Sequence, residues 1–212
     1  MKLIASIANL NRYNSGAYRE VMLSFPTTTE QVKSALRKIC IDGHVNKEII
    51  ITGYDTDIPG LDQHLGEYTD LDELNFLASR IASLTQEQLE LFSAAVQHGE
   101  YTGTMQDLIN LTYNLGCFTL YPGIDSAEEY GHVLIEEIQE LELPERIEPY
   151  IDYESYGEDA KINEGGEFTT YGYIVNNQSG FEDMYDGITV PKAYQVFHYP
   201  FRMLGSRQET ST

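Results

Sequence analysis

The chain has 212 residues, of which 42% are hydrophobic and 11% aromatic, so it can bury a core and wholesale disorder is not expected. The absence of any run of 18 apolar residues excludes an ordinary membrane-spanning helix, and the apolar start is too short for a secretory signal. Cys40 and Cys117 match no metal or redox spacing, so we expect reduced thiols and a cytoplasmic protein.

The charge is strongly acidic and unevenly distributed. The chain carries 34 acidic and 13 basic residues, a formal net charge of −21. Residues 1–53 hold four acidic and seven basic residues, whereas residues 54–190 hold 29 acidic and three basic ones, a net charge of −26. Ordinary solvated surfaces mix both signs, and such self-repulsion destabilises a compact state. Solubility alone is therefore a weak explanation, and a function that uses the charge is favoured.

Residues 3–55 predict a small sheet with one helix. Residues 3–10 and 17–25 are suited to two strands of a hairpin, with a turn at 11–16. The threonines at 27–29 can cap a helix whose apolar residues repeat at helical spacing. An apolar strand at 48–55 completes a ββαβ unit.

The middle of the chain predicts helices. Residues 70–98 indicate a helical hairpin, with Asp70 capping the first helix and Thr85 the second. Residues 104–115 predict another helix, which ends at Gly116.

The remaining residues mix helix and strand. Ser126 can cap a helix whose apolar stripe continues to Leu141, with most of its glutamates on the solvent face. Residues 167–175 predict a strand, and residues 191–200 predict a last one. The expected fold class is α+β.

The sequence offers little that indicates catalysis. Nucleotide-binding glycine loops, zinc-protease and serine-hydrolase motifs and kinase signatures are all absent from it. The five histidines are scattered, and a lone histidine is far more often structural than a ligand. A carboxylate pair could serve a hydrolase, but among 34 acidic residues some pair will always look suitable, so it is not evidence for hydrolysis. A basic groove for nucleic acid is missing as well.

Residues 136–159 concentrate the charge. They contain ten Asp or Glu residues, three tyrosines and a single base, Arg146. Carboxylates three or four residues apart on a helix stand roughly 5–6 Å apart, a charge density comparable with that of the phosphates along a DNA strand. A protein with a Lys- and Arg-lined DNA channel should bind such a surface, so the segment is interpreted as a DNA decoy.

The sequence resembles the ArdA family of antirestriction proteins, which are DNA mimics carried by plasmids, transposons and phages. Three stretches carry the resemblance: IANLNRYNSGAYREVMLSFPTTTEQVKSAL (7–36), GEYTDLDELNFLASRIASLTQEQLELFSAAV (66–96) and YIDYESYGEDAKINEGGEFTTYGYI (150–174). They follow the family's order, and the last is the most specific.

The resemblance implies an elongated molecule of three small domains. We place an N-terminal sheet domain at 1–60, a helical middle at 61–102 and a C-terminal α+β domain at 103–212. It also implies a homodimer joined through the C-terminal domains. The implied activity is occupation of the DNA groove of type I restriction–modification enzymes, at their methyltransferase core. Catalysis, cofactors, metals, direct nucleic-acid binding and membrane attachment are not implied.

The basic first 53 residues fit mimicry poorly, so we expect the partner to contact the middle and C-terminal parts. The predicted acidic surface comprises Asp70, Asp72, Glu73, Glu87, Glu90, Glu128, Glu129, Glu136, Glu137, Glu140, Glu142, Glu145, Glu148, Asp152, Glu154, Glu158 and Asp159. One alternative is an acidic module that targets a transcription factor or another defence nuclease. The other is the small hydrolase. Single carboxylate changes should abolish hydrolysis, whereas mimicry should weaken cumulatively.

Overall fold

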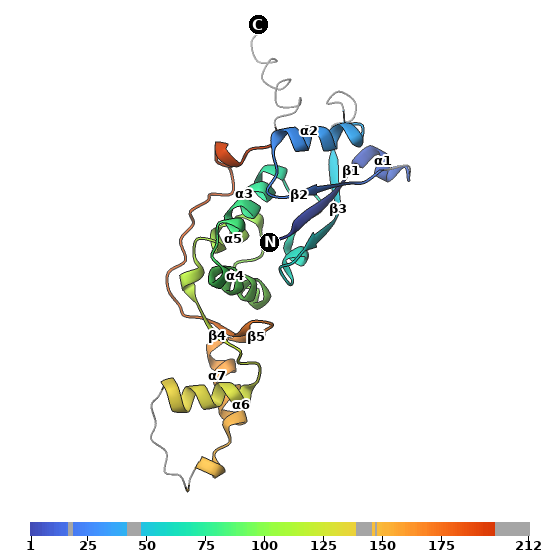
Figure 1. Ribbon diagram of the computed structural model, residues 1–212. Helices are drawn as coiled ribbons and strands as arrows, with labels where there is room; N and C mark the ends of the chain where they lie inside the picture. The colour runs from blue at the N-terminus through green and yellow to red at the C-terminus, as the bar shows by residue number, and fades with distance from the viewer. Residues whose placement is uncertain (17–18, 42–47, 139–145, 147, 198–212) are drawn as a thin grey trace. The chain divides into compact units, whose positions relative to one another are not determined.

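The computed structural model describes residues 1–212 except 17–18, 42–47, 139–145, 147 and 198–212. In the described part of the chain, seven α-helices and two three-stranded antiparallel sheets form a mixed α+β fold (Figure 1), which confirms the expected class. The chain divides into two compact units. Unit 1 contains residues 1–84, 101–113 and the chain from Asp183 onward, and unit 2 contains residues 85–100 and 114–182. The division into three domains at residues 60 and 102 stays a prediction.

The sheet of unit 1 has the strand order β2–β1–β3, formed by Leu3–Asn9 (β1), Val21–Ser24 (β2) and Ile49–Thr56 (β3). The central strand pairs antiparallel with both neighbours, so that Ala5 lies opposite Leu23 on one side and Tyr54 on the other. Buried residues alternate with half-buried ones along most of β1, as expected of a sheet with one covered face. The predicted hairpin and third strand are confirmed.

Helix α2 (Thr29–Lys38) packs against β2. It begins with a capping box, in which the Gln31 N–H donates to the Thr28 hydroxyl (3.3 Å) and the Thr28 N–H donates to the Gln31 side chain (2.9 Å). The apolar residues on its inner face are buried. The helix predicted after the threonine cap is therefore confirmed.

The link after β1 differs from the expected turn at 11–16, because Leu10–Asn14 form a short helix, α1. The buried Asn9 begins this helix by accepting a hydrogen bond from the Arg12 N–H (3.2 Å). Its side-chain amide also donates to the carbonyls of Ile39 and Cys40 at 3.4 Å each. These partners compensate for the loss of water around a buried amide. One side chain thus joins α1 to the end of α2.

Helices α3 (Leu71–Ala82) and α5 (Met105–Leu111) pack together in unit 1. Arg80 connects them, because its Nε donates to the Thr112 hydroxyl (3.2 Å) and its guanidinium carbon lies 3.7 Å from the centroid of the Tyr113 ring. A cation beside the last turn of a helix is favourable, since the terminal carbonyls carry partial negative charge. The helix predicted over 104–115 is real but ends earlier, at Leu111.

The chain after Asp183 is held by asparagine side chains that act as backbone partners. Asn110 accepts a hydrogen bond from the Tyr185 N–H (2.8 Å) and donates to the Tyr185 carbonyl (2.9 Å). Asn75 donates to the Tyr194 carbonyl at 2.9 Å. The asparagine side chains therefore supply hydrogen-bond partners to backbone groups that are not paired in a sheet.

The last strand predicted over 191–200 is wrong in the part that the structure describes. Lys192–Tyr194 form a single 3₁₀ turn instead. The Tyr194 ring stacks on Phe76 with the ring centroids 4.3 Å apart. Tyr194 therefore packs on α3 instead of lying in a strand.

The sheet of unit 2 has the order β4–β6–β5, formed by Phe118–Pro122 (β4), Glu167–Thr169 (β5) and Gly172–Asn176 (β6). The strand predicted over 167–175 is in fact a hairpin, and β4 was not predicted. The chain reverses where the Thr169 hydroxyl accepts from the Tyr171 N–H (3.2 Å) and donates to the Gly172 carbonyl (2.8 Å). Gly172 has φ +130°, a conformation that side-chain-bearing residues rarely adopt.

Three α-helices complete unit 2: α4 (Gln86–His98), α6 (Ala127–His132) and α7 (Tyr153–Glu164). Helix α4 starts at the predicted Thr85 cap and packs against the sheet of unit 2. Helix α6 starts at the predicted Ser126 cap and continues as a π-helical segment, Val133–Ile138. The helices expected at these caps are confirmed, whereas α7 was not predicted.

Candidate functional site

Helices α6 and α7 of unit 2 pack closely because glycines face the contact. A Cβ added to Gly131 would overlap the carbonyl oxygen of Tyr153, and one added to Gly157 would overlap the carbonyl oxygen of Ala127. A side chain at position 131 or 157 would prevent the two helix backbones from approaching this closely, so both positions require glycine. The two helices form one rigid support for the side chains on their outer surfaces.

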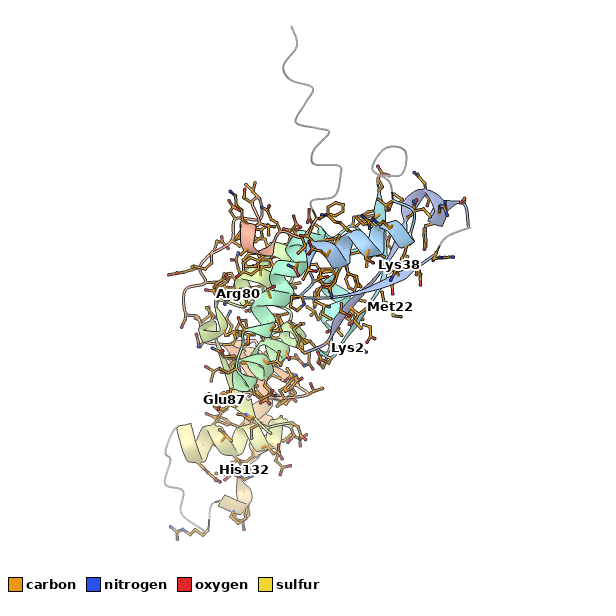
Figure 2. The ribbon with its side chains drawn as sticks, turned by 45° about the horizontal axis from the view of Figure 1, so that its top comes forward. Lys2, Met22, Lys38, Arg80, Glu87 and His132 are labelled. Atoms are coloured by element: carbon orange, nitrogen blue, oxygen red, sulfur yellow. The ribbon has the colours of Figure 1, made fainter. Side chains whose placement is uncertain are left out.

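Aromatic stacking adds to this contact. The His132 ring on α6 (Figure 2) stacks on the Tyr153 ring of α7, with centroids 3.6 Å apart and planes 15° from parallel. The His132 Nδ1 also lies 3.1 Å from the Glu136 carboxylate. The start of α7 is thus packed against the end of α6.

A buried tyrosine pair connects α6 to the sheet and to the end of α7. The hydroxyls of Tyr130 (2.6 Å) and Tyr173 (2.9 Å) both donate to the same carboxylate oxygen of Glu164. The two rings lie 3.9 Å apart between centroids. Burial, together with the neighbouring Glu164 carboxylate, raises the pKa of both phenols well above the ordinary value of 10.0. Both tyrosines are therefore neutral donors at physiological pH.

The outer surfaces of α6 and α7 carry exposed carboxylates. Seven residues of the predicted acidic surface are exposed here: Glu128, Glu129, Glu136, Asp152, Glu154, Glu158 and Asp159. On α7, Glu154 and Glu158 are one helical turn apart, so their side chains stand roughly 5–6 Å from each other. We name these seven residues the α6/α7 acidic surface.

Some of these carboxylates also organise the local backbone. Asp152 accepts from the Ser155 N–H (3.0 Å) and hydroxyl (2.8 Å), and these bonds lower the pKa of Asp152 below its ordinary value. Glu129 accepts from the Asp125 N–H at 3.0 Å. Both carboxylates remain exposed while they make these bonds.

Few cations balance this charge in the described part of unit 2. Lys161 on α7 pairs with Glu167 at 3.7 Å and lies 5.0 Å from the centre of the Phe168 ring, so it is engaged inside the unit. Arg146 is exposed. Among the described residues, exposed acidic side chains therefore outnumber basic ones on the two helices.

The acidic residues of α3 behave differently from the prediction. Asp72 was expected on the surface but is only 1% exposed, so that assignment is wrong. It accepts hydrogen bonds from the N–H groups of Val196 and Phe197, both at 2.7 Å. Asp72 therefore has a structural role inside unit 1, where its carboxylate holds the segment that returns along α3. This arrangement depends on contacts more than 120 residues apart in sequence, which no local pattern reveals.

Two neighbours of Asp72 are also engaged. The exposed Asp70 caps α3 by accepting from the Asp72 N–H (2.7 Å). Glu73 is half-buried and accepts from the Tyr185 hydroxyl at 2.9 Å. Desolvation raises the pKa of Glu73, although the bond from Tyr185 opposes that shift. These carboxylates border a cavity of about 340 Å³ in unit 1.

The remaining residues of the predicted acidic surface lie on α4 or outside the described side chains. On α4, Glu87 is exposed (Figure 2), whereas Glu90 is half-buried and accepts from the Gln86 amide at 2.8 Å. Five predicted residues lie outside the side chains that the structure describes: Glu137, Glu140, Glu142, Glu145 and Glu148.

Sequence reasoning missed two residues of this region. Asp125 is exposed immediately before the α6 cap and adds a carboxylate to the same end of the helix. Glu164 links Tyr130 and Tyr173. The Asp-Ser pair before a run of glutamates is a readable signal for Asp125. The role of Glu164 depends on a contact 34 residues away, which sequence spacing does not show.

The candidate site consists of exposed carboxylates carried by two packed helices. Among the described residues, no group of three or more His, Cys, Asp or Glu side chains is arranged to hold a metal ion. In the same part of the chain, no helix is long and apolar enough to cross a membrane.

Comparison with known protein families matches residues 5–175 to the family described as antirestriction protein (ArdA). The chain belongs to the ArdA family. The resemblance expected from the sequence is thereby confirmed. A comparison with curated protein sequences gave no match.

Membership of the ArdA family implies an antirestriction function, and restriction–modification enzymes are the general class of partner. Proteins of this family are inhibitors rather than enzymes. The matched region includes the whole α6/α7 acidic surface and ends within β6. The residues from 183 to 197, part of which packs along α3, lie beyond the match.

Proposed function

We propose that this ArdA-family protein inhibits type I restriction–modification enzymes by occupying their DNA groove as a mimic of DNA. The α6/α7 acidic surface supplies the main contact, and its carboxylates take the place of backbone phosphates. The partner surface is the Lys- and Arg-lined groove of the methyltransferase core. No bond is made or broken in this function.

The observation that carries the proposal is the exposure of all seven carboxylates on a single helix pair. Charge alone would not suffice, because Asp72 is acidic and yet buried. On α6 and α7, however, the acids face solvent and the nearby Lys161 is already paired with Glu167. Among the described residues of unit 2, therefore, few cations have to be displaced from these carboxylates when a basic partner approaches.

Rigidity is the second part of the argument. DNA presents its phosphates on a stiff scaffold, and a protein that imitates them benefits from holding its carboxylates in place before binding. The glycine contact at Gly131 and Gly157 and the bonds from Tyr130 and Tyr173 to Glu164 hold α6 and α7 together.

The binding free energy should be distributed over many carboxylates of the surface. Each exposed ion pair contributes little and is screened by salt, so affinity depends on the sum of many pairs. The basic residues of the first 53 positions would repel a basic groove, so we place the contact on unit 2. We further propose that two copies associate through the C-terminal region and so extend the acidic surface.

Competition tests the proposal. A purified type I methyltransferase core is bound to fluorescent target DNA, and the full-length protein is added at several salt concentrations. We expect displacement at stoichiometric amounts, with weaker displacement as salt rises. Absence of displacement even at low salt would remove type I enzymes as the target, and the acidic surface would need another DNA-binding partner.

A matched pair of charge variants locates the surface. One variant changes Glu128, Glu154, Glu158 and Asp159 to the corresponding amides, and its control changes the same number of exposed acids in unit 1, namely Glu20, Glu30, Asp62 and Glu67. We expect the first variant to lose most of its displacement and the control to retain it. Equal losses would mean that net charge matters and its location does not.

A further inference from the structure

The sheet of unit 1 has an unpaired edge at β2. In the order β2–β1–β3, strand β2 has a neighbour on one side only among the residues that the structure describes. The Phe25 N–H donates to the Leu3 carbonyl (2.8 Å), and backbone groups alternate in direction along an antiparallel strand. Met22 and Ser24 therefore direct their N–H and C=O groups away from β1. An edge of this kind is a template for an additional strand.

A groove runs along this edge. It has a volume of about 230 Å³ and is lined by all four residues of β2. Its other wall is α2, which contributes Gln31, Ser34, Ala35 and Lys38. These positions repeat at the spacing of helical turns, so one face of α2 lies along the strand. A strand-and-helix groove of this form can hold an extended peptide that adds to the sheet.

Charge and apolar exposure indicate what fits the groove. Lys38 is the one charged side chain among its lining residues, and it forms no ion pair in the described part of the chain. Lys33 and Arg37 lie on the same helix. Met22, which Figure 2 labels together with Lys38, is 75% exposed. An occupant would cover this side chain and bring carboxylates to the lysine.

We propose that the groove between β2 and α2 binds an extended acidic peptide segment of another protein by strand addition. Backbone hydrogen bonds to Met22 and Ser24 give the segment its position, and glutamate or aspartate side chains pair with Lys38. A second copy of this chain is the weaker candidate, because edge-to-edge pairing would bring two basic helices together. The site lies in unit 1 and does not depend on the acidic surface of unit 2.

The test uses the full-length, ¹⁵N-labelled protein and a capped heptapeptide, TETETET, as the probe. We expect saturable shifts of the amide signals of residues 21–24 and of the groove-facing residues of α2. The matched peptide TKTKTKT should leave these signals unchanged. Lys38→Glu should weaken the binding of TETETET by about threefold or more. Arg12→Glu, the same charge reversal on α1, should not weaken it.

A second variant separates strand addition from simple charge attraction. Ser24→Pro removes an N–H that points away from β1, and proline is tolerated at such an edge position. We expect it to abolish the shifts of β2 while leaving the rest of the spectrum in place. Equal binding of the two peptides, or unchanged binding by Ser24→Pro, would overturn the proposal. Concentration-dependent shifts at β2 without peptide would assign the edge to a second copy and would also overturn it.

Discussion

The acidic residues of α3 and those of α6 and α7 have the same chemistry but different uses. On α3, Asp70 caps the helix, Asp72 is buried beneath the returning chain and Glu73 accepts from Tyr185. On α6 and α7, seven carboxylates face solvent, and their internal bonds are limited to caps and neighbouring side chains. A net charge read from sequence therefore combines structural acids with those that are free to meet a partner.

This difference has a physical origin. A carboxylate that loses water must gain hydrogen-bond donors, and two backbone N–H groups donate to the Oδ1 atom of Asp72. An exposed carboxylate keeps its water and needs no such partner. Substitutions in the two regions should therefore have different consequences. Those of the α3 acids should lower stability, and those of the α6/α7 acidic surface should weaken inhibition.

The largest effect is expected at Asp72. Replacing it by alanine removes the acceptor of the buried Val196 N–H and of the part-buried Phe197 N–H, so Asp72→Ala should lower the free energy of unfolding by about 3 kcal/mol. Urea unfolding measures the change. Asp72→Asn retains an oxygen acceptor and should lose less. An unaltered midpoint for Asp72→Ala would contradict the structural role, and Glu158→Ala serves as the exposed control.

The glycine contact between α6 and α7 should give the next largest effect. A methyl group at Gly157 overlaps backbone atoms of Ala127, so Gly157→Ala should cost about 2 kcal/mol of stability. It should also weaken inhibition, because the supporting helices move apart. Gly116→Ala is the control, since an added Cβ there meets no atom within 4 Å. Normal stability in the Gly157 variant would show that the helices are not held this closely.

The tyrosine pair should give a smaller effect that depends on pH. Tyr130→Phe removes a hydrogen bond to Glu164 and should cost about 1 kcal/mol at neutral pH. The folded-state pKa of Tyr130 is raised above the ordinary 10.0, so its stabilising contribution is complete below pH 10 and decreases as the pH rises further. Unfolding measured between pH 8 and pH 11 should therefore show a shallower decline for the variant. A decline as steep as that of the unmodified protein would contradict this assignment.

The smallest effect is expected from a single exposed carboxylate. Glu158→Gln should change the inhibitory concentration by less than about fivefold, because one screened pair contributes little. Successive neutralisation of Glu154 and Asp159 should lower inhibition step by step without lowering the unfolding midpoint. Complete loss after the first substitution would favour a single catalytic or anchoring carboxylate over a distributed surface.

Local patterns predicted the elements whose signals lie within one or two turns of chain. The caps at Thr28, Thr85 and Ser126 were readable because a hydroxyl followed by apolar residues at helical spacing satisfies the first N–H groups of a helix. Helix α7 was missed because acidic residues and a central glycine, Gly157, interrupt any apolar stripe. Its stability comes from packing on α6, which the sequence of α7 does not show.

The sequence by itself determined the α+β class, the main helix starts, the acidic composition and the family. Only the tertiary structure decided which acids are free: it buried Asp72 under a segment more than 120 residues later and left the carboxylates of α6 and α7 in water. The tertiary structure also places Gly131 and Gly157 at the contact between α6 and α7, and it pairs β5 with β6 in a hairpin. The reason is physical, because caps and periodicity act over a few residues, whereas burial depends on which distant segments meet.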